Sequence, residues 1–152
     1  VLSNANNYRI TLNNEIPPAD RVISPSDFGF HNAIRGNDGI IRFVDFEYAG
    51  WDDPAKMVGE FFSQIAVPVP MAYFRRFAET VAGYSSEKKE MLKRMELLLP
   101  LYRIKWCCIA LNHFLPLDSD RKRFADIDAD KRKHEQLKKT RYLLNSIESL
   151  RL

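Results

Sequence analysis

The stretch Ala33–Phe46 reads AIRGNDGIIRFVDF and predicts a β-hairpin. Two runs rich in strand-forming residues, Ala33–Arg35 and Ile40–Phe46, flank a four-residue segment, Gly36–Gly39. That segment, Gly-Asn-Asp-Gly, has the composition of a tight turn, because glycine and asparagine tolerate the positive φ angles that such turns require.

The register of this hairpin decides which polar side chains meet. With the turn centred on its two middle residues, Ile34 is expected to face about Ile41, and Asn32 to face about Phe43. Asn32 and Asp45 then lie at the same open end of the hairpin, one diagonal step apart.

The segment before the hairpin, Pro25–Asn32 (PSDFGFHN), mixes two aromatic side chains with several polar ones. Buried polar groups are costly without partners, and exposed phenylalanines would remain in contact with water. We therefore expect Phe28 and Phe30 to be buried in the core, so that they hold Asp27 and Asn32 at the lip of the loop.

Three oxygen-bearing side chains, those of Asp27, Asn32 and Asp45, are thus expected to converge. A hard cation such as Mg²⁺ prefers oxygen ligands and keeps several waters, so it needs only one or two ligands from the protein. Phosphate oxygens can fill the remaining positions.

Ser24–Ile34 (SPSDFGFHNAI) and Gly39–Lys56 (GIIRFVDFEYAGWDDPAK) together resemble the aminoglycoside phosphotransferase and choline kinase family of protein-kinase-like enzymes. The resemblance implies that Asp27 is the catalytic base and that Asn32 and Asp45 are ligands of magnesium. It also implies ATP or GTP as the phosphoryl donor and a hydroxyl group of a small molecule as the acceptor.

Two features depart from the family pattern. Pro25 stands where the family has a histidine two residues before the catalytic aspartate, which puts the support of the loop in doubt more than its chemistry. The first glycine of the chain is Gly29, so nothing before Asp27 can supply a glycine-rich, nucleotide-covering lobe. We therefore interpret residues 1–152 as a single domain, the C-terminal lobe of such an enzyme, inactive as an isolated chain.

Beyond the hairpin the pattern becomes helical. We expect helices over Pro54–Ile65 with Asp53 as N-cap, over Met71–Val81, over Glu87–Leu99, and over Leu101–Leu115 at the centre of the molecule. Pro100 is expected to kink or break the helical run between the last two. A short strand is expected at Arg21–Ile23, and the final helix should carry an apolar stripe of Leu137, Leu144 and Ile147, with Leu143 and Leu150 beside it.

The predicted fold class is accordingly α+β and mostly α: a catalytic β-hairpin followed by a helical bundle, as in the C-terminal lobe of a protein-kinase-like fold.

The composition is that of a globular protein, with 45% hydrophobic and 28% charged residues and a net charge of +3. That charge is too small to indicate nucleic acid as a partner. The longest apolar run, Trp106–Leu111, is too short for a membrane span. Adjacent Cys107 and Cys108 indicate no disulfide framework, and we expect both to be buried in a protein of the cytoplasm.

Several interpretations stay open. Asp27 and Asn32 could simply cap turns of an ordinary hairpin. His31 could be a base, although a core histidine bonded to a backbone carbonyl is the stronger expectation. Glu47 could support the metal site or form a plain salt bridge.

The helical part leaves further alternatives. Arg103 and Lys105 could extend to the surface or line a substrate cleft. Residues 121–141 hold nine Lys or Arg against four acidic residues, which fits a solvated helix face or a surface for an anionic partner. The alternative to an enzyme is a non-catalytic interaction module derived from a kinase-like lobe.

Overall fold

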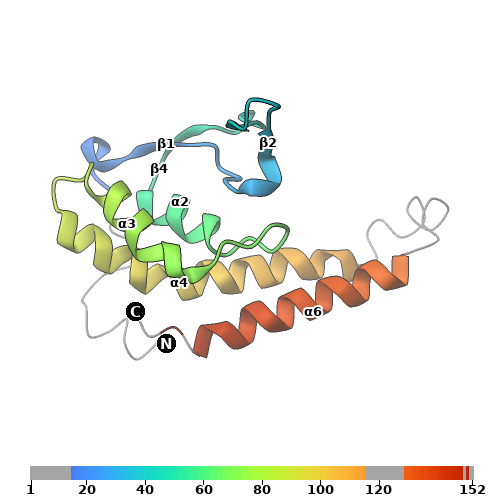
Figure 1. The fold of residues 1–152 in the computed structure, drawn as a ribbon. Helices are drawn as coiled ribbons and strands as arrows, with labels where there is room; N and C mark the ends of the chain where they lie inside the picture. Colours follow the sequence, from blue (N-terminus) through green and yellow to red (C-terminus); the bar gives the residue numbers. More distant parts are fainter. Residues whose placement is uncertain (1–14, 116–128, 149, 151–152) are drawn as a thin grey trace.

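The computed structural model describes residues 15–115, 129–148 and 150 and has an α+β fold in which helices predominate. In the chain order, the elements are η1 (Pro18–Asp20), β1 (Val22–Ser24), η2 (Phe30–Asn32), β2 (Ala33–Arg35), β3 (Ile41–Phe43), β4 (Gly50–Asp52), α2 (Pro54–Phe61), η3 (Met71–Tyr73), α3 (Phe74–Ala82), α4 (Lys88–Leu111), η4 (Asn112–Phe114) and α6 (Ala129–Glu148). The strands form one layer, α2 and α3 lie beneath them, and α4 and α6 lie side by side on the far side (Figure 1).

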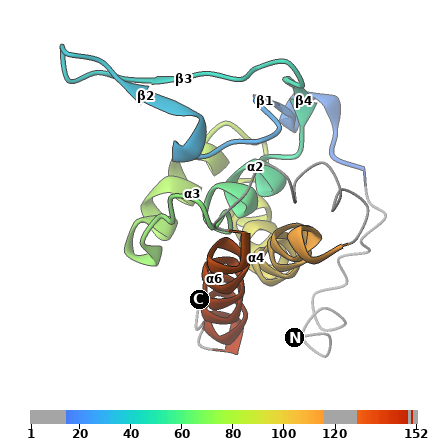
Figure 2. The same ribbon diagram turned by 90° about the vertical axis from the view of Figure 1, so that its right-hand side faces the viewer.

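The predicted hairpin is present as the antiparallel pair β2–β3, which reaches away from the helices (Figure 2). Its register differs by one residue from the predicted one, because Ile34 pairs with Arg42 and Ala33 pairs with Phe43. The loop is asymmetric: Gly39 has φ +78°, and the Gly36 N–H donates to the Ile40 carbonyl at 3.0 Å. The turn therefore includes Ile40, which a turn centred on Asn37 and Asp38 would leave in the second strand.

A second pair of strands is formed by one strand before the hairpin and one after it. β1 pairs antiparallel with β4, and Ile23 lies opposite Trp51. The strand expected at Arg21–Ile23 is thus confirmed with a shift of one residue, whereas β4 had no expected counterpart. β4 leads directly into α2, so the strand layer is tied to the helices at this point.

Helix α2 begins as its sequence predicts. The Asp53 carboxylate accepts the Ala55 N–H at 2.8 Å, and Pro54 occupies the first helical position. The same carboxylate receives Arg94 of α4 through Nε at 2.9 Å and Nη2 at 2.7 Å. The helix ends at Phe61, earlier than the expected Ile65, and the N–H groups of Ser63 and Gln64 both donate to the Glu60 carbonyl.

The helix expected over Met71–Val81 is confirmed as η3 followed by α3. Of the two outcomes expected at Pro100, a kink or a break, the break is wrong, because α4 runs without interruption from Lys88 to Leu111 with Pro100 inside it. A proline in a helix costs on the order of 3 kcal/mol through its missing N–H and its clash with the preceding turn. Adjacent Leu98 and Leu99 are both buried, and this burial favours a continuous helix.

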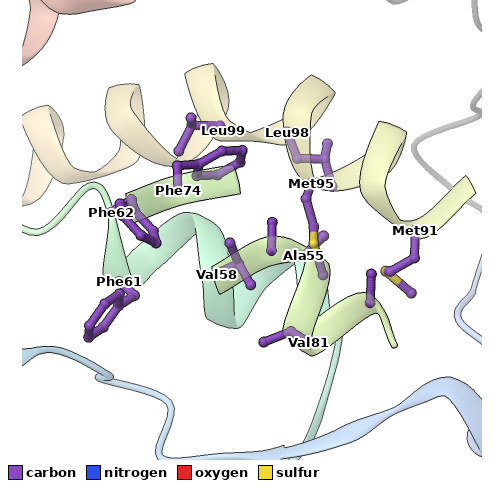
Figure 3. Packing of buried hydrophobic residues seen from close by; sticks show 12 residues of the cluster. Ala55, Val58, Phe61, Phe62, Phe74, Val81, Met91, Met95, Leu98 and Leu99 are labelled. Carbon is purple, nitrogen blue, oxygen red and sulfur yellow. The ribbon is translucent and has the colours of Figure 1, made fainter. Parts of the chain in front are cut away.

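The main core lies where α2, α3 and α4 meet (Figure 3). Its buried side chains are Ala55, Val58, Phe61, Phe62, Phe74, Ala78, Val81, Ala82, Met91, Met95, Leu98 and Leu99. The C-terminal half of α4 then packs on α6 through a smaller cluster, Ile65, Cys107, Ala110 and Leu143. α4 thus packs against α2, α3 and α6, and its part of the main core comes from Met91–Leu99. The expectation that Leu101–Leu115 forms a separate central helix is wrong, because Ile104, Ile109 and Leu111 are exposed.

The predicted apolar side of helix α6 is confirmed except at Leu144, since Leu143 is buried and Leu137 and Ile147 are half-buried. Thr140 and Leu143 are buried, whereas Leu144, placed by the sequence pattern in the apolar stripe, is 49% exposed. The cysteine expectation is half right, since Cys107 is buried and Cys108 is exposed. Among the described residues no helix combines the length and the apolar character needed to cross a membrane.

Candidate functional site

The loop before β2 rests on a platform of aromatic rings. Phe28 stacks on Phe61 of α2 with ring centroids 4.8 Å apart, and it contacts Phe43 of β3 at 4.9 Å. Phe30 contacts the same two rings at 5.3 and 5.9 Å. Both side chains are half-buried against the main core. The prediction that Phe28 and Phe30 fix this loop to the core is confirmed.

Asp27 follows a strained turn. Ser26 has φ +70°, a left-handed conformation that is costly for a residue with a Cβ, and the Asp27 N–H donates to the Pro25 carbonyl at 2.9 Å. This is a tight γ-type turn. The buried hydroxyl of Ser24 accepts the Ser26 N–H at 3.2 Å and so stabilises this turn. Strain of this kind persists only where the surrounding structure holds it, and it is concentrated at functional sites.

Asp27 and Asn32, two of the three residues expected to converge, contact each other. Asn32 Nδ2 donates to the Asp27 carbonyl at 3.0 Å and to Asp27 Oδ2 at 3.4 Å. The side chain of Asp27 is 52% exposed, so its carboxylate stands at the open lip of the loop. Because Asn32 contacts Asp27 through its nitrogen, its Oδ1 is left to accept from or coordinate another group. The contacts themselves would also serve a loop-closing asparagine, the turn-capping alternative.

Asp45 lies at the same end of the hairpin. The N–H of Val44, the residue before it, donates to the Asn32 carbonyl at 2.9 Å. Asp45 is exposed and has φ +66°; it and Ser26 are the non-glycine residues with positive φ in the described part of the chain. No direct contact joins the Asp45 carboxylate to Asp27 or Asn32 within the described ranges, so convergence of all three oxygens stays a prediction.

The donor set suits magnesium by its chemistry. The Oδ1 of Asn32 and the carboxylate of Asp45 are hard oxygen donors, and an ion that keeps most of its waters needs no more than these two. Within the described residues, no group of three or more His, Cys, Asp or Glu side chains is arranged to hold a metal ion. That result does not bear on a pair of ligands that includes an asparagine.

The sequence suggested that His31 bonds a backbone carbonyl, but the structure gives it a different partner. Its Nε2 lies 3.1 Å from Asp27 Oδ2, and its ring meets the Trp106 ring edge-on with centroids 6.2 Å apart. The spacing of four residues between Asp27 and His31 was the one signal in the sequence that could have indicated this contact. The resemblance assigned no role to His31, and the structure adds it to the candidate site.

Arg103 and Lys105 of α4, for which two roles were left open, both have partners in the structure. Arg103 is buried and contacts the Ser146 hydroxyl of α6, while Lys105 pairs with the buried Glu60 of α2. Burial lowers the pKa of Arg103 from its ordinary value. Arg103 thus joins two helices and does not line a cleft. Glu47 is exposed and forms no ion pair with any described residue.

The basic segment is only partly described. Residues 121–128 lie outside the described residues, and the Lys and Arg side chains of α6 are all exposed: Lys131, Arg132, Lys133, Lys138, Lys139 and Arg141. An exposed basic helix face of this kind fits the solvated-face interpretation.

Comparisons with protein-family models, with curated proteins and with solved structures each gave no match.

Proposed function

We propose that this chain is the C-terminal lobe of a kinase-like phosphotransferase that moves the γ-phosphoryl group of ATP or GTP to a hydroxyl of a small molecule. The observation that carries the proposal is the environment of Asp27. Its half-exposed carboxylate follows a strained turn and is held by two side chains, Asn32 and His31, above an aromatic platform. The strained turn and the two side-chain contacts together favour a functional aspartate over one that only caps a turn.

Each residue has one task in the proposed reaction. The Asp27 carboxylate orients the acceptor hydroxyl and takes its proton as the new O–P bond forms and the bond from the γ-phosphorus to the leaving nucleoside diphosphate breaks. Asn32 Oδ1 and the Asp45 carboxylate would hold magnesium, which supplies positive charge against the phosphates. Asn32 would also hold Asp27 in position through its Nδ2 contacts.

The exposed apolar side chains of the strands and their connections support a covering partner. Ile23 and Trp51 lie opposite each other across β1 and β4 and are 66% and 69% exposed. Further large apolar side chains in the strands and their connections are exposed as well: Ile34, Ile40, Ile41, Val44, Phe46 and Tyr48. So many exposed apolar residues in one region are unusual for a free surface. A nucleotide and the lobe that covers it would bury them.

The proposal is tested with the protein that carries this chain in its natural context. Asp27→Asn should lower kcat by about 10²–10⁴-fold, the share that a positioned base contributes, and leave nucleotide affinity nearly unchanged. Asp45→Asn should weaken metal–nucleotide binding as well as turnover, with partial recovery at high magnesium. Asp38→Asn at the exposed tip of the hairpin is the matched control and should change neither.

Three measurements check these expectations: steady-state kinetics, a magnesium titration and thermal melts. Residues 1–152 alone should show no appreciable transfer, because the residues that the structure describes include no element that would cover the nucleotide. Near-wild-type turnover combined with a large loss of Tm would mean that Asp27 and Asp45 only support the fold. Strong magnesium-dependent turnover by residues 1–152 alone would contradict the interpretation of the chain as one lobe.

A non-catalytic interaction module is the second candidate. It is favoured by apolar side chains left exposed along the last turns of α4 and just beyond it: Ile104, Ile109, Leu111, Phe114 and Leu115. The Asp27 and Asp45 variants separate the two candidates. In a module they would leave partner binding unchanged, and no variant would have phosphoryl transfer to lose.

A further inference from the structure

His31 lies against the proposed base but has no part in the proposed reaction as described so far. Its Nε2 is 3.1 Å from Asp27 Oδ2, the same oxygen that Asn32 Nδ2 approaches at 3.4 Å. The His31 side chain is 20% exposed and that of Asp27 is 52% exposed. The imidazole therefore reaches the carboxylate from the protein side and leaves its solvent side open.

The ring of His31 occupies space that a side chain at position 29 would fill. A Cβ at position 29 would lie 2.6 Å from His31 Nδ1 and 3.0 Å from the Gln64 side chain, so only glycine fits there. On another side the Trp106 ring of α4 meets the imidazole at 75°. Gly29 thus leaves room for the imidazole, and Trp106 contacts it from α4.

The two ring nitrogens differ in their surroundings. Nδ1 is buried and has no hydrogen-bond partner among the described residues, whereas Nε2 faces the carboxylate. A proton on Nδ1 would be a buried donor without an acceptor, which is costly. A neutral ring with its proton on Nε2 avoids this cost and carries that proton on the nitrogen that lies 3.1 Å from Asp27 Oδ2.

We propose that His31 is a positioning residue for Asp27: its Nε2–H donates to Asp27 Oδ2 and fixes the orientation in which the carboxylate meets the acceptor hydroxyl. This inference rests on the proposed phosphoryl transfer. It also accounts for Pro25, which stands where the resembled family has a supporting histidine. Here the support comes from four residues after the aspartate.

The contact is tested by NMR of residues 1–152 labelled with ¹⁵N at histidine, at a pH where histidine is neutral. His31 should carry its proton on Nε2 alone, with ring nitrogen shifts that differ from those of His134, which lies exposed on α6. In Asp27→Ala these shifts should move toward those of His134. A proton on Nδ1, or shifts that ignore Asp27→Ala, would overturn the positioning role.

The catalytic consequence is tested in the protein that carries this chain in its natural context. His31→Ala should lower kcat at least about ten-fold, a part of what a positioned base supplies, with little change in the KM for the nucleotide. His31→Gln, whose amide can donate from a similar position, should recover most of the loss. His134→Ala is the matched control and should leave kcat unchanged.

The two tests separate the failure of this inference from the failure of the proposed function. Phosphoryl transfer that depends on Asp27 but is unaffected by His31→Ala would remove the positioning role and keep the function. An Asp27-dependent His31 signal in a protein without phosphoryl transfer would remove both the function and the catalytic role of His31, and would leave only a structural contact.

Discussion

Ser26 is the residue at which the candidate site departs most from unstrained geometry. Its φ of +70° fits glycine better than serine, and the following Asp27 N–H bonds back to the Pro25 carbonyl. A left-handed conformation costs a residue with a Cβ roughly 1–2 kcal/mol, while glycine adds roughly 0.4–1 kcal/mol of chain entropy to the unfolded state. The chain thus keeps a residue that is less stable here than glycine would be.

We predict that Ser26→Gly raises the free energy of unfolding by roughly 0.5–1 kcal/mol, the difference between the strain relieved and the entropy added. The same change should lower turnover, since a flexible turn holds the Asp27 carboxylate less firmly. Urea unfolding and steady-state kinetics measure the two effects. Ser26→Ala keeps the strain and is the control. A glycine variant less stable than the alanine variant would show that the turn is not strained.

The sequence predicted part of this site because part of it is local. Asp27 and Asn32, expected to converge with Asp45, do contact each other, and the aromatic Phe28 and Phe30 pack against the core, although they are half-buried and not fully buried. The partner of His31 was missed because the direction of its ring depends on the missing Cβ at Gly29 and on Trp106, 75 positions further along the chain. Contacts between distant segments leave no periodic signal in a sequence.

At the scale of elements, strong local signals were correct and long-range packing corrected the rest. The Asp53 cap and the turn signal at Gly36–Gly39 placed α2 and the β2–β3 hairpin. The one-residue error in register came from the left-handed Gly39, and the uninterrupted helix through Pro100 came from burial on neighbouring helices. Both outcomes depend on backbone geometry or tertiary contacts that residue types alone do not specify.

Asp53 joins three elements, since it follows β4, caps α2 and binds Arg94 of α4. Both side chains of the ion pair are 16% exposed. We predict that Asp53→Ala lowers the free energy of unfolding by about 2–4 kcal/mol, because it removes the cap and leaves Arg94 without its carboxylate. Asp53→Asn retains a capping oxygen and should cost less. Chemical denaturation measures both, and equal losses would mean that the cap contributes little.

Gly59 sets how closely α2 approaches α4. A Cβ at this position would lie 2.9 Å from Cγ of Tyr102, whose ring packs against the main core. Burial raises the pKa of Tyr102, as do the nearby carboxylates of Asp53 and Glu60. The ring therefore fills a tight space between the two helices.

We predict that Gly59→Ala lowers the free energy of unfolding by about 1–3 kcal/mol through overpacking. The usual gain of about 0.5–1 kcal/mol for alanine in a helix would be outweighed. Gly59→Ala in a Tyr102→Leu background removes the clash and should recover that gain. Thermal or urea unfolding of the double-mutant cycle measures the coupling, and strict additivity would contradict the close approach.

At the scale of the whole molecule, contacts between residues far apart in the sequence connect the start of the strand layer to the helices. Asp20 of η1 lies 66 positions before Ser86, which stands just ahead of α4. Asp20 Oδ1 accepts the Ser86 N–H at 2.7 Å, and Oδ2 accepts the Ser86 hydroxyl at 3.1 Å. These bonds, with the backbone N–H first, lower the pKa of the buried Asp20 carboxyl below its ordinary value of 3.8. The start of the strand layer is thereby fixed to the central helix.

A lowered folded-state pKa means that the ionised carboxylate stabilises the fold above about pH 4 and that this stabilisation is lost as the pH falls through the folded value. We predict that Asp20→Asn lowers Tm near neutral pH, and that the difference from wild type shrinks steadily as the pH is lowered from about 4 toward 2. Asp38→Asn removes another carboxyl whose pKa is lowered, by Arg42, but it lies exposed at the hairpin tip and should change Tm little. Thermal melts across this pH range measure all three proteins. A Tm difference for Asp20→Asn that stays constant with pH would mean that the contact acts through shape and not through charge.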